Sequence, residues 1–194
     1  MFSLDTRLFL AMNGLAGKSQ AFDAVVTFCA GNLIWLMAIA VLVRAAILVV
    51  RNDRRAAAYF TAVTRSAAAV SIALLGNWLF GQYLWFRERP FVALYDVHLL
   101  AVPPYGWQSF PSGHAAAAFV VAFSVYFEDR HAGTVLLVAA TAVALGRVFG
   151  GVHYPLDVLV GAFAGFVWAF AARAASRRFG VEPSVAAFVK RIHG

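Results

Sequence analysis

The sequence predicts an all-α, polytopic membrane protein, with a bundle of about five transmembrane helices preceded by an N-terminal interfacial helix. Of its 194 residues, 62% are hydrophobic and only 13% are charged, and the mean hydropathy is +0.76. A water-soluble domain cannot enclose so much apolar side chain in one core. Apolar stretches of about 18 or more residues recur between short charged breaks, which matches the thickness of a bilayer. We therefore expect a single membrane domain over residues 1–194.

The expected elements follow one another in a simple order. Residues 2–20 mix apolar and charged side chains and are too polar to span a bilayer, which favours an amphipathic helix at the interface. We expect no removable signal peptide, because no basic region leads directly into a short apolar stretch with a cleavage site. Five spans are then predicted, at about 22–50, 57–86, 112–127, 132–152 and 155–175.

Basic residues predict the orientation of these spans. They gather in the connection after the first span and in the carboxy-terminal tail, as Arg51, Arg54, Arg55, Arg173, Arg177, Arg178, Lys190 and Arg191. Both segments are expected in the cytoplasm, because cytoplasmic loops carry an excess of positive charge. The amino terminus and the connections 87–111 and 146–157 then lie on the outer side. Arg44 and Arg65, close to the basic connection, are interpreted as snorkelling side chains rather than functional intramembrane charges.

Charge and cysteine content exclude several classes of protein. The net charge is +7, yet the basic residues sit at the ends of apolar segments rather than on one soluble face, so we expect no nucleic-acid partner. The single cysteine, Cys29, lies inside an apolar run. Neither an intramolecular disulfide nor a cysteine zinc cluster is therefore expected. The sequence leaves the oligomeric state open.

Three polar segments, residues 87–90, 111–114 and 147–157, are all expected at the outer surface. In the first segment Arg89 precedes Pro90, and a proline disfavours helical geometry at the residue before it. The guanidinium of Arg89 is thus left at the membrane surface, where it can bind a phosphate through two parallel hydrogen bonds. Taken alone, an ordinary snorkelling interfacial arginine is the favoured interpretation of this residue.

The second segment predicts an anion site at the start of a helix. Ser112 is a good N-cap for the third span, and Gly113 lets a ligand approach the backbone closely. The free N–H groups and the positive end of the helix dipole would face an anion, with His114 beside it. An ordinary capping serine next to an interfacial histidine is the alternative.

The third segment predicts an oriented histidine. Pro155 suits the first turn of the fifth span, and a separation of four residues places His153 and Asp157 on one face. A carboxylate that holds one ring nitrogen leaves the other as a nucleophile or base. Metal ligation by His114, His153 and Asp157 is the rival interpretation. We disfavour it because several arginines would converge on the cation, and we expect no metal and no cofactor.

These motifs resemble the signature of the type-2 phosphatidic acid phosphatase superfamily of integral membrane lipid phosphatases. In that signature six residues separate a lysine from Arg-Pro, Pro-Ser-Gly-His follows, and Ser-Arg is followed after five residues by His and after three more by Asp. The matching residues here are Arg89, Pro90, Pro111, Ser112, Gly113, His114, Arg147, His153 and Asp157. Gln82 stands in place of the lysine and Gly146 in place of the serine. The chain length and flanking helices also resemble short bacterial members that dephosphorylate undecaprenyl diphosphate.

The resemblance implies a hydrolase for lipid phosphates or diphosphates. It implies that His153 attacks phosphorus to form a phosphohistidine, that Asp157 orients it, and that His114 protonates the leaving oxygen and then activates water. The groups expected to bind the phosphate oxygens are Arg89, Arg147, Ser112 and the Gly113 amide. The active site would face outward from the bacterial cytoplasmic membrane.

Undecaprenyl diphosphate is the favoured substrate, because a lipid carrier recycled outside the membrane suits a minimal protein with few soluble loops. Phosphatidylglycerol phosphate, phosphatidic acid and lipid A phosphate are alternatives. A membrane protein that binds anionic lipid without turnover is a further alternative, because two positions depart from the signature. A vanadate-dependent haloperoxidase is disfavoured by the five lipid-embedded spans and the short chain.

Gln82 is also expected to face the phosphate. It lies seven residues before Arg89, nearly two helical turns, so both side chains share one face of the second span. Arg87 would point to a different side of an ideal helix. It could replace the missing lysine only if the helix unwinds before Pro90.

Overall fold

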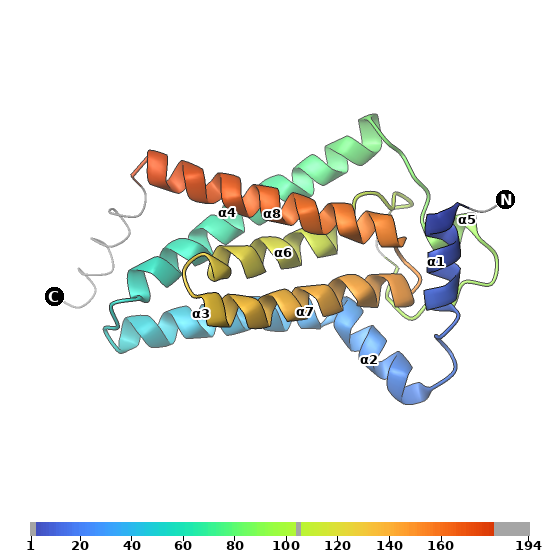
Figure 1. Cartoon of the computed structure of the whole chain (residues 1–194), viewed down its shortest axis with the longest axis horizontal. Helices are drawn as coiled ribbons and strands as arrows, with labels where there is room; N and C mark the ends of the chain where they lie inside the picture. Colours follow the sequence, from blue (N-terminus) through green and yellow to red (C-terminus); the bar gives the residue numbers. More distant parts are fainter. Residues whose placement is uncertain (1–2, 104–105, 181–194) are drawn as a thin grey trace.

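The computed structural model describes residues 3–103 and 106–180, and within these ranges it is an all-helical bundle, which confirms the predicted fold class (Figure 1). The helices are α1 (Leu4–Asn13), α2 (Gln20–Gly31), α3 (Leu33–Val50), α4 (Ala56–Tyr83), α5 (Pro90–Ala93), α6 (Gly113–Tyr126), α7 (Arg130–Phe149) and α8 (Pro155–Arg178). Lys190 and Arg191 of the predicted basic tail lie outside the described residues.

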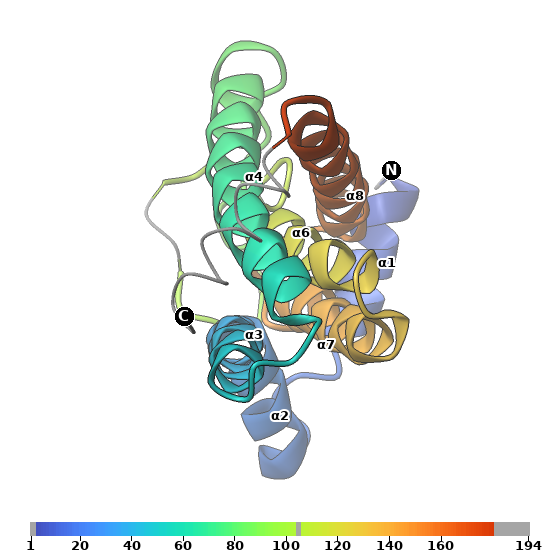
Figure 2. The same cartoon turned by 90° about the vertical axis from the view of Figure 1, so that its left-hand side faces the viewer.

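Four of the described helices, α3, α4, α7 and α8, are long and apolar enough to cross a membrane. The expected third span is the shorter helix α6, whose 14 residues cover only about 21 Å at 1.5 Å per residue. It lies in the centre of the bundle and contacts α3, α4, α7 and α8 (Figure 2). The protein is thus a multi-pass membrane bundle built around a short internal helix.

The expected first span, residues 22–50, is not one continuous helix. It is divided into α2 and α3, which differ in direction on either side of Asn32 (Figure 1). Gly31 and Asn32 are both weak helix formers, which explains why the break falls at this point. Only the α3 part meets the length and hydropathy of a membrane span.

The expected second span, residues 57–86, ends earlier than predicted, at Tyr83. The backbone after it is held in an extended form, because the N–H of Arg89 donates to the carbonyl of Trp107 (2.9 Å) and the N–H of Ser109 donates to the carbonyl of Arg87 (2.7 Å). This pairing with a loop about 20 residues away ends the helix.

Helix α1 lies across one end of the bundle, which we call the motif end because the three polar segments meet there (Figure 1). The amide Nδ2 of Asn13 donates to the carbonyls of His98 (2.8 Å) and Phe149 (2.9 Å). Phe9 is fully buried against the ring of Tyr154. The basic connection between α3 and α4 lies at the opposite end.

Of the two arginines near that opposite end, Arg65 does not snorkel as expected, whereas Arg44 stays exposed. Arg65 is buried, and its Nη2 donates to the Glu128 carboxylate (2.9 Å) and to the carbonyl of Ser124 (3.1 Å). Arg44 forms an ion pair with Asp129 (3.0 Å). The turn between α6 and α7 supplies both carboxylates, so these arginines tie the helices together.

Two glycines of α8 allow it to pack closely on α6. A Cβ atom at Gly161 would lie 2.5 Å from the carbonyl oxygen of Ser112, and one at Gly165 would lie 2.6 Å from that of Ala116. Small residues of this kind let membrane helices approach closely. The contact brings the beginnings of α6 and α8 together at the motif end.

We predict that Gly165→Ala destabilises the bundle by about 1–3 kcal/mol, because the added methyl group overlaps the α6 backbone. Thermal unfolding in detergent measures this as a lower melting temperature. Gly31→Ala is the matched control, since nothing lies within 4 Å of a Cβ atom there. Equal melting temperatures for the two variants would contradict the close contact between α6 and α8.

Candidate active site

The motif end brings together side chains from four separate segments. They are the extended chain after α4, the loop that leads into α6, the last turn of α7 and the connection into α8. The buried polar residues there include Arg89, Ser109, Ser112, Arg147, His153 and Asp157. The three polar segments expected to converge therefore do so.

His153 is held with one ring nitrogen unprotonated. Its Nε2 lies 3.0 Å from Nη1 of Arg89. A guanidinium can only donate hydrogen bonds, so Nε2 must accept and the ring proton is on Nδ1. The Nδ1 atom faces Ser109 Oγ at 3.4 Å and Asp157 Oδ2 at 3.7 Å. Nε2 is therefore the nitrogen that can act as a nucleophile.

Ser109 links His153 to Asp157 and was not among the residues expected from the sequence. Its hydroxyl donates to Asp157 Oδ2 at 2.5 Å, and it is almost fully buried. The direct distance of 3.7 Å between His153 and Asp157 is too long for a good hydrogen bond, so the serine completes the connection. The only hint in the sequence is its place two residues before Pro111.

Arg89 and Arg147 differ in how fully their donors are used. Arg89 Nη1 also donates to the carbonyl of Val152 (3.0 Å), and its Nε donates to that of Gly106 (3.1 Å). Arg147 Nη1 donates to the carbonyl of Ala30 (3.1 Å), whereas its Nε and Nη2 are buried without a hydrogen-bond partner. Two unpaired donors on one guanidinium match two oxygens of a phosphate.

Ser112 and Gly113 start α6 beside Asp157. Ser112 is fully buried, and its N–H donates to the backbone carbonyl of Asp157 (3.0 Å). The Ser112 hydroxyl accepts from the N–H of Ala115 at the long distance of 3.5 Å, which is the capping role expected. The next residue, Gly113, lines two cavities, which are described in the next two paragraphs.

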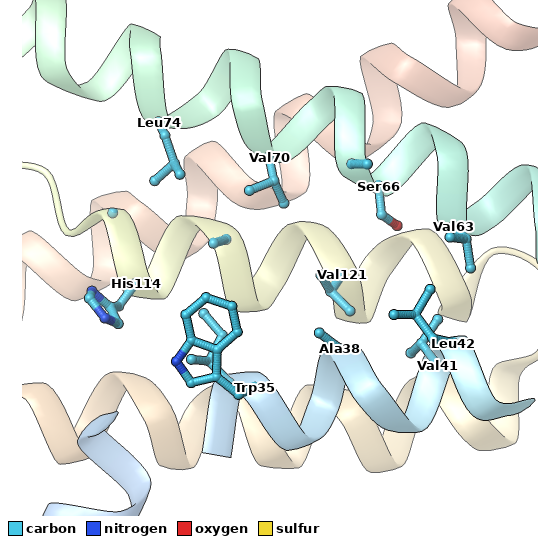
Figure 3. A pocket seen from close by; sticks show the side chains of 14 residues that line it. Trp35, Ala38, Val41, Leu42, Val63, Ser66, Val70, Leu74, His114 and Val121 are labelled. Atoms are coloured by element: carbon cyan, nitrogen blue, oxygen red, sulfur yellow. The ribbon is translucent and has the colours of Figure 1, made fainter. Parts of the chain in front are cut away.

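His114 stands between these groups and a large apolar groove. It interacts electrostatically with Arg147, His153 and Arg89. Its ring also lines a groove of about 490 Å³ between α3, α4 and α6, and Figure 3 shows it at one end of that groove. The rest of the lining is almost wholly apolar, with Trp35 and Leu74 near His114. The groove therefore suits a hydrocarbon chain whose polar end reaches His114.

Gln82 lines a second cavity, of about 250 Å³, together with Arg89 and Gly113. The reason given from the sequence was wrong, because α4 ends at Tyr83 and Gln82 and Arg89 do not share a helical face. Gln82 nevertheless faces the same space as Arg89. This leaves an uncharged amide where the family signature has a lysine.

Arg87 also points into the motif end, contrary to expectation, because the chain has unwound before Pro90. Its Nη1 donates to Asp157 Oδ1 (3.0 Å), and its Nη2 forms an ion pair with Asp5 (2.7 Å). The structure thus places Arg87 behind the carboxylate of Asp157, and it does not show it as a substitute for the lysine.

Close packing explains the glycine at position 146. A Cβ atom on Gly146 would lie 2.8 Å from the backbone nitrogen of Ala30 and 3.1 Å from Cβ of Cys29. A serine there would therefore push α2 away. The same contact places the Ala30 carbonyl where Arg147 binds it.

Burial and nearby charges set the protonation states of His153 and Arg89, which lie in the connections between helices. Burial, together with the positive charges of Arg89 and Arg147 and opposed by Asp157, lowers the pKa of His153 from 6.5 to about 4. Burial also lowers the pKa of Arg89 to about 10, which leaves it charged at neutral pH. In the part of the chain that the structure describes, no group of three His, Cys, Asp or Glu is arranged to hold a metal ion.

These features define a class of protein, a multi-pass helical membrane protein with buried arginines next to a histidine whose Nε2 is unprotonated. The model of the PAP2 superfamily matches residues 55–180, and the chain belongs to this superfamily. The region matched contains every motif residue from Gln82 to Asp157. The protein is accordingly a membrane lipid phosphatase.

Several known proteins are similar over most of their length. Undecaprenyl-diphosphatase BcrC of Bacillus subtilis is 28% identical over 156 residues, which cover 80% of this chain and 76% of that protein. The crystal structure of Aquifex aeolicus LpxE is 27% identical, with a TM-score of 0.68 over 89% of this chain and 96% of LpxE. A PAP2-type phosphatidylglycerolphosphate phosphatase from Bacillus subtilis shares the fold at 19% identity, with a TM-score of 0.52 over 90% and 94% of the two chains.

The lowered pKa of His153 predicts how stability depends on pH. Between pH 6.5 and about 4 the unfolded chain takes up a proton at this residue and the folded protein does not. The free energy of unfolding should therefore fall by on the order of 3 kcal/mol as the pH drops through this window.

His153→Gln should lack this contribution, because glutamine does not titrate. Melting temperatures in detergent at about pH 7.5 and about pH 5 test it, and the unmodified protein should lose more on acidification than His153→Gln. Equal losses would contradict a buried, neutral His153.

Gln82→Lys should strengthen inhibition by orthovanadate, because a charged donor makes a hydrogen bond roughly twice as strong as a neutral one. The inhibition constant on one lipid diphosphate measures the change. Gln20→Lys, an exposed residue at the start of α2, is the control for general attraction of anions. If both variants show the same inhibition, the cavity that Gln82 shares with Arg89 does not hold the anion.

Proposed function

We propose that this protein hydrolyses a lipid phosphate or diphosphate, with undecaprenyl diphosphate as the favoured substrate, through a phosphohistidine at the outer face of a bacterial cytoplasmic membrane. The observation that carries this proposal is the unprotonated Nε2 of His153 next to an arginine with two unpaired buried donors. A nucleophile beside an anion cradle is the arrangement that phosphoryl transfer needs.

The first step forms a bond between Nε2 of His153 and the terminal phosphorus while the bond from that phosphorus to its leaving oxygen breaks, which is the bridging oxygen of a lipid diphosphate or the ester oxygen of a lipid monophosphate. His114, in its protonated form, gives a proton to that leaving oxygen. The positive charge that develops on His153 is balanced by Asp157 through Ser109. Arg89 and Arg147 stabilise the negative charge on the equatorial oxygens.

The second step returns the histidine to its starting state. His114, now neutral, takes a proton from water, and the water oxygen attacks phosphorus as the bond to Nε2 breaks. Inorganic phosphate leaves, and both histidines regain their initial protonation. No step requires a metal ion, because the arginines and the start of α6 supply the positive charge.

The apolar groove supports a lipid substrate with a long hydrocarbon chain. It runs from His114 along α3, α4 and α6, so a chain lying in it would place its phosphate beside the histidines (Figure 3). The similarity to undecaprenyl-diphosphatase BcrC favours a polyprenyl diphosphate. Phosphatidylglycerol phosphate is the second candidate, suggested by the shared fold of the phosphatase that acts on it.

The charge distribution supports the outer orientation. Arg51, Arg54 and Arg55 lie between α3 and α4, at the end of the bundle opposite to α1 (Figure 1). A cytoplasmic location for this basic connection is what the positive-inside rule favours, and the motif end would then lie outside.

We predict that His153→Ala lowers phosphate release at least about a thousandfold, because the nucleophile is lost. Lipid diphosphate radiolabelled at its terminal phosphate should label the unmodified protein and leave this variant unlabelled, when the reaction is quenched in alkaline detergent because phosphohistidine is hydrolysed by acid. His131→Ala, an exposed histidine at the other end of the bundle, is the matched control and should retain full activity.

The same assay distinguishes the mechanism and the substrates. Turnover should persist in EDTA and stop with orthovanadate, which mimics the trigonal-bipyramidal phosphorus. Undecaprenyl diphosphate should be hydrolysed with a higher kcat/KM than phosphatidylglycerol phosphate or phosphatidic acid. Full activity of His153→Ala, or an absolute need for a divalent metal, would refute the mechanism.

A further inference from the structure

We propose that Asp5 of α1 and Arg87 are positioning residues for the nucleophile, which together keep the charge beside His153 at one net negative unit. The inference rests on the proposed function and adds to it a role for the N-terminal helix. Neither residue belongs to the motifs that identify the family.

Arg87 is fixed between two carboxylates. Its Nη2 lies 2.7 Å from Asp5 Oδ2, and its Nη1 donates to Asp157 Oδ1 at 3.0 Å. The guanidinium also lies 3.6 Å from the centroid of the Tyr154 ring. Both ends and one face of the group are thus occupied, so Arg87 serves Asp157 and is not placed to bind the substrate phosphate.

Asp157 depends on this arrangement because it has no exposed surface. Its Oδ2 accepts from the Ser109 hydroxyl and from the N–H of Tyr154 (2.8 Å), while Oδ1 accepts from Arg87. A buried carboxylate without donors would be strongly destabilised. Arg87 therefore holds Asp157 in its ionised form and in the orientation that Ser109 requires.

Arg87 alone would also weaken the catalytic function of Asp157. An ion pair of one arginine and one aspartate is neutral overall, and it would balance little of the positive charge that His153 gains on bonding phosphorus. Asp5 adds the second negative charge, so that the group of three carries a net charge of −1. The nucleophile then has the same electrostatic support that an unpaired Asp157 would give.

Other contacts hold α1 in place, so the charge of Asp5 can be changed separately. Asn13 fixes the end of α1 to two backbone carbonyls, and Phe9 is fully buried. Asp5 Oδ1 also accepts from the N–H of Leu156 (2.9 Å), at the start of α8. Asp5→Asn keeps an oxygen for this bond and removes only the charge.

Other charged or titratable groups that act on His153 belong to the candidate active site described above. Arg89 and Arg147 lower its pKa, and Asp157 opposes them. His114 is a further titratable side chain that interacts with it. None of these is altered by a change at position 5, so a change in the pH profile reports the Asp5 and Arg87 pair.

The test compares Asp5→Asn, Arg87→Gln and the double variant with the unmodified protein in detergent, with undecaprenyl diphosphate as the probe. Asp5→Asn should lower kcat about tenfold and leave KM within about twofold, as expected when positioning rather than binding is lost. The acidic limb of kcat/KM should move to lower pH, because the imidazolium loses a nearby negative charge.

The double variant gives the sharpest result. In the double variant the glutamine amide still offers Asp157 Oδ1 a donor while the charges at positions 5 and 87 are gone, so the net charge returns to −1 and kcat should be higher than in Asp5→Asn alone. Melting temperatures of all variants are measured alongside, because residues of one ion-pair network can also compensate one another in stability; recovery of kcat without a parallel recovery of the melting temperature marks the electrostatic role, and recovery only in parallel with the melting temperature would refute it. Asp96→Asn is the control, since Asp96 is exposed in a loop at the same end and asparagine suits its positive φ.

The possible outcomes distinguish failure of the positioning role from failure of the proposed function. If the unmodified protein releases phosphate but Asp5→Asn matches Asp96→Asn in kcat and in pH profile, the positioning role is refuted and the proposed function stands. A double variant no better than Asp5→Asn would refute the charge balance. Absence of phosphate release by the unmodified protein would overturn the proposed function and with it this inference.

Discussion

The burial of one carboxylate, that of Asp157, organises the motif end of this protein. A charge removed from water needs several donors around it, and here they come from Arg87, from the Ser109 hydroxyl and from the backbone of Tyr154. These donors belong to segments far apart in the sequence. The extended chain after α4, the loop before α6 and the start of α8 are therefore fixed relative to one another by the same group that orients His153.

The membrane bundle supplies the rigid frame that this cluster requires. Gly161 and Gly165 bring α8 close to α6, and Gly146 brings α2 close to α7. The first contact places Ser112 beside Asp157, and the second places the carbonyl of Ala30 on Arg147. The apolar groove between α3, α4 and α6 ends at His114, so the same packing that assembles the candidate site also leaves an apolar space beside it, where we propose that the lipid chain lies. The candidate site and the groove thus arise from one arrangement of short and long helices.

The sequence predicted well what depends on local composition. The apolar stretches located the long helices, although the first stretch proved to be two helices, and the spacing of His153 and Asp157 indicated a shared site. The sequence did not predict the contacts between distant segments. The helix α4 ends at Tyr83 because the chain after it pairs with residues 107–109. The local sequence around Tyr83 does not indicate this end. Ser109 and Asp5 carry no distinctive pattern, and only the folded chain places them beside Asp157.

The central claim is that His153 Nε2, Arg89 and Arg147 form a cradle for a phosphorus that the histidine attacks. A crystal structure of the protein with orthovanadate tests it most directly. The account predicts vanadium bonded to Nε2 of His153, equatorial oxygens on Arg89 and on the free nitrogens of Arg147, and an apical oxygen facing His114. Vanadate bonded to Nδ1, or held away from His153 with Arg147 still unpaired, would contradict it.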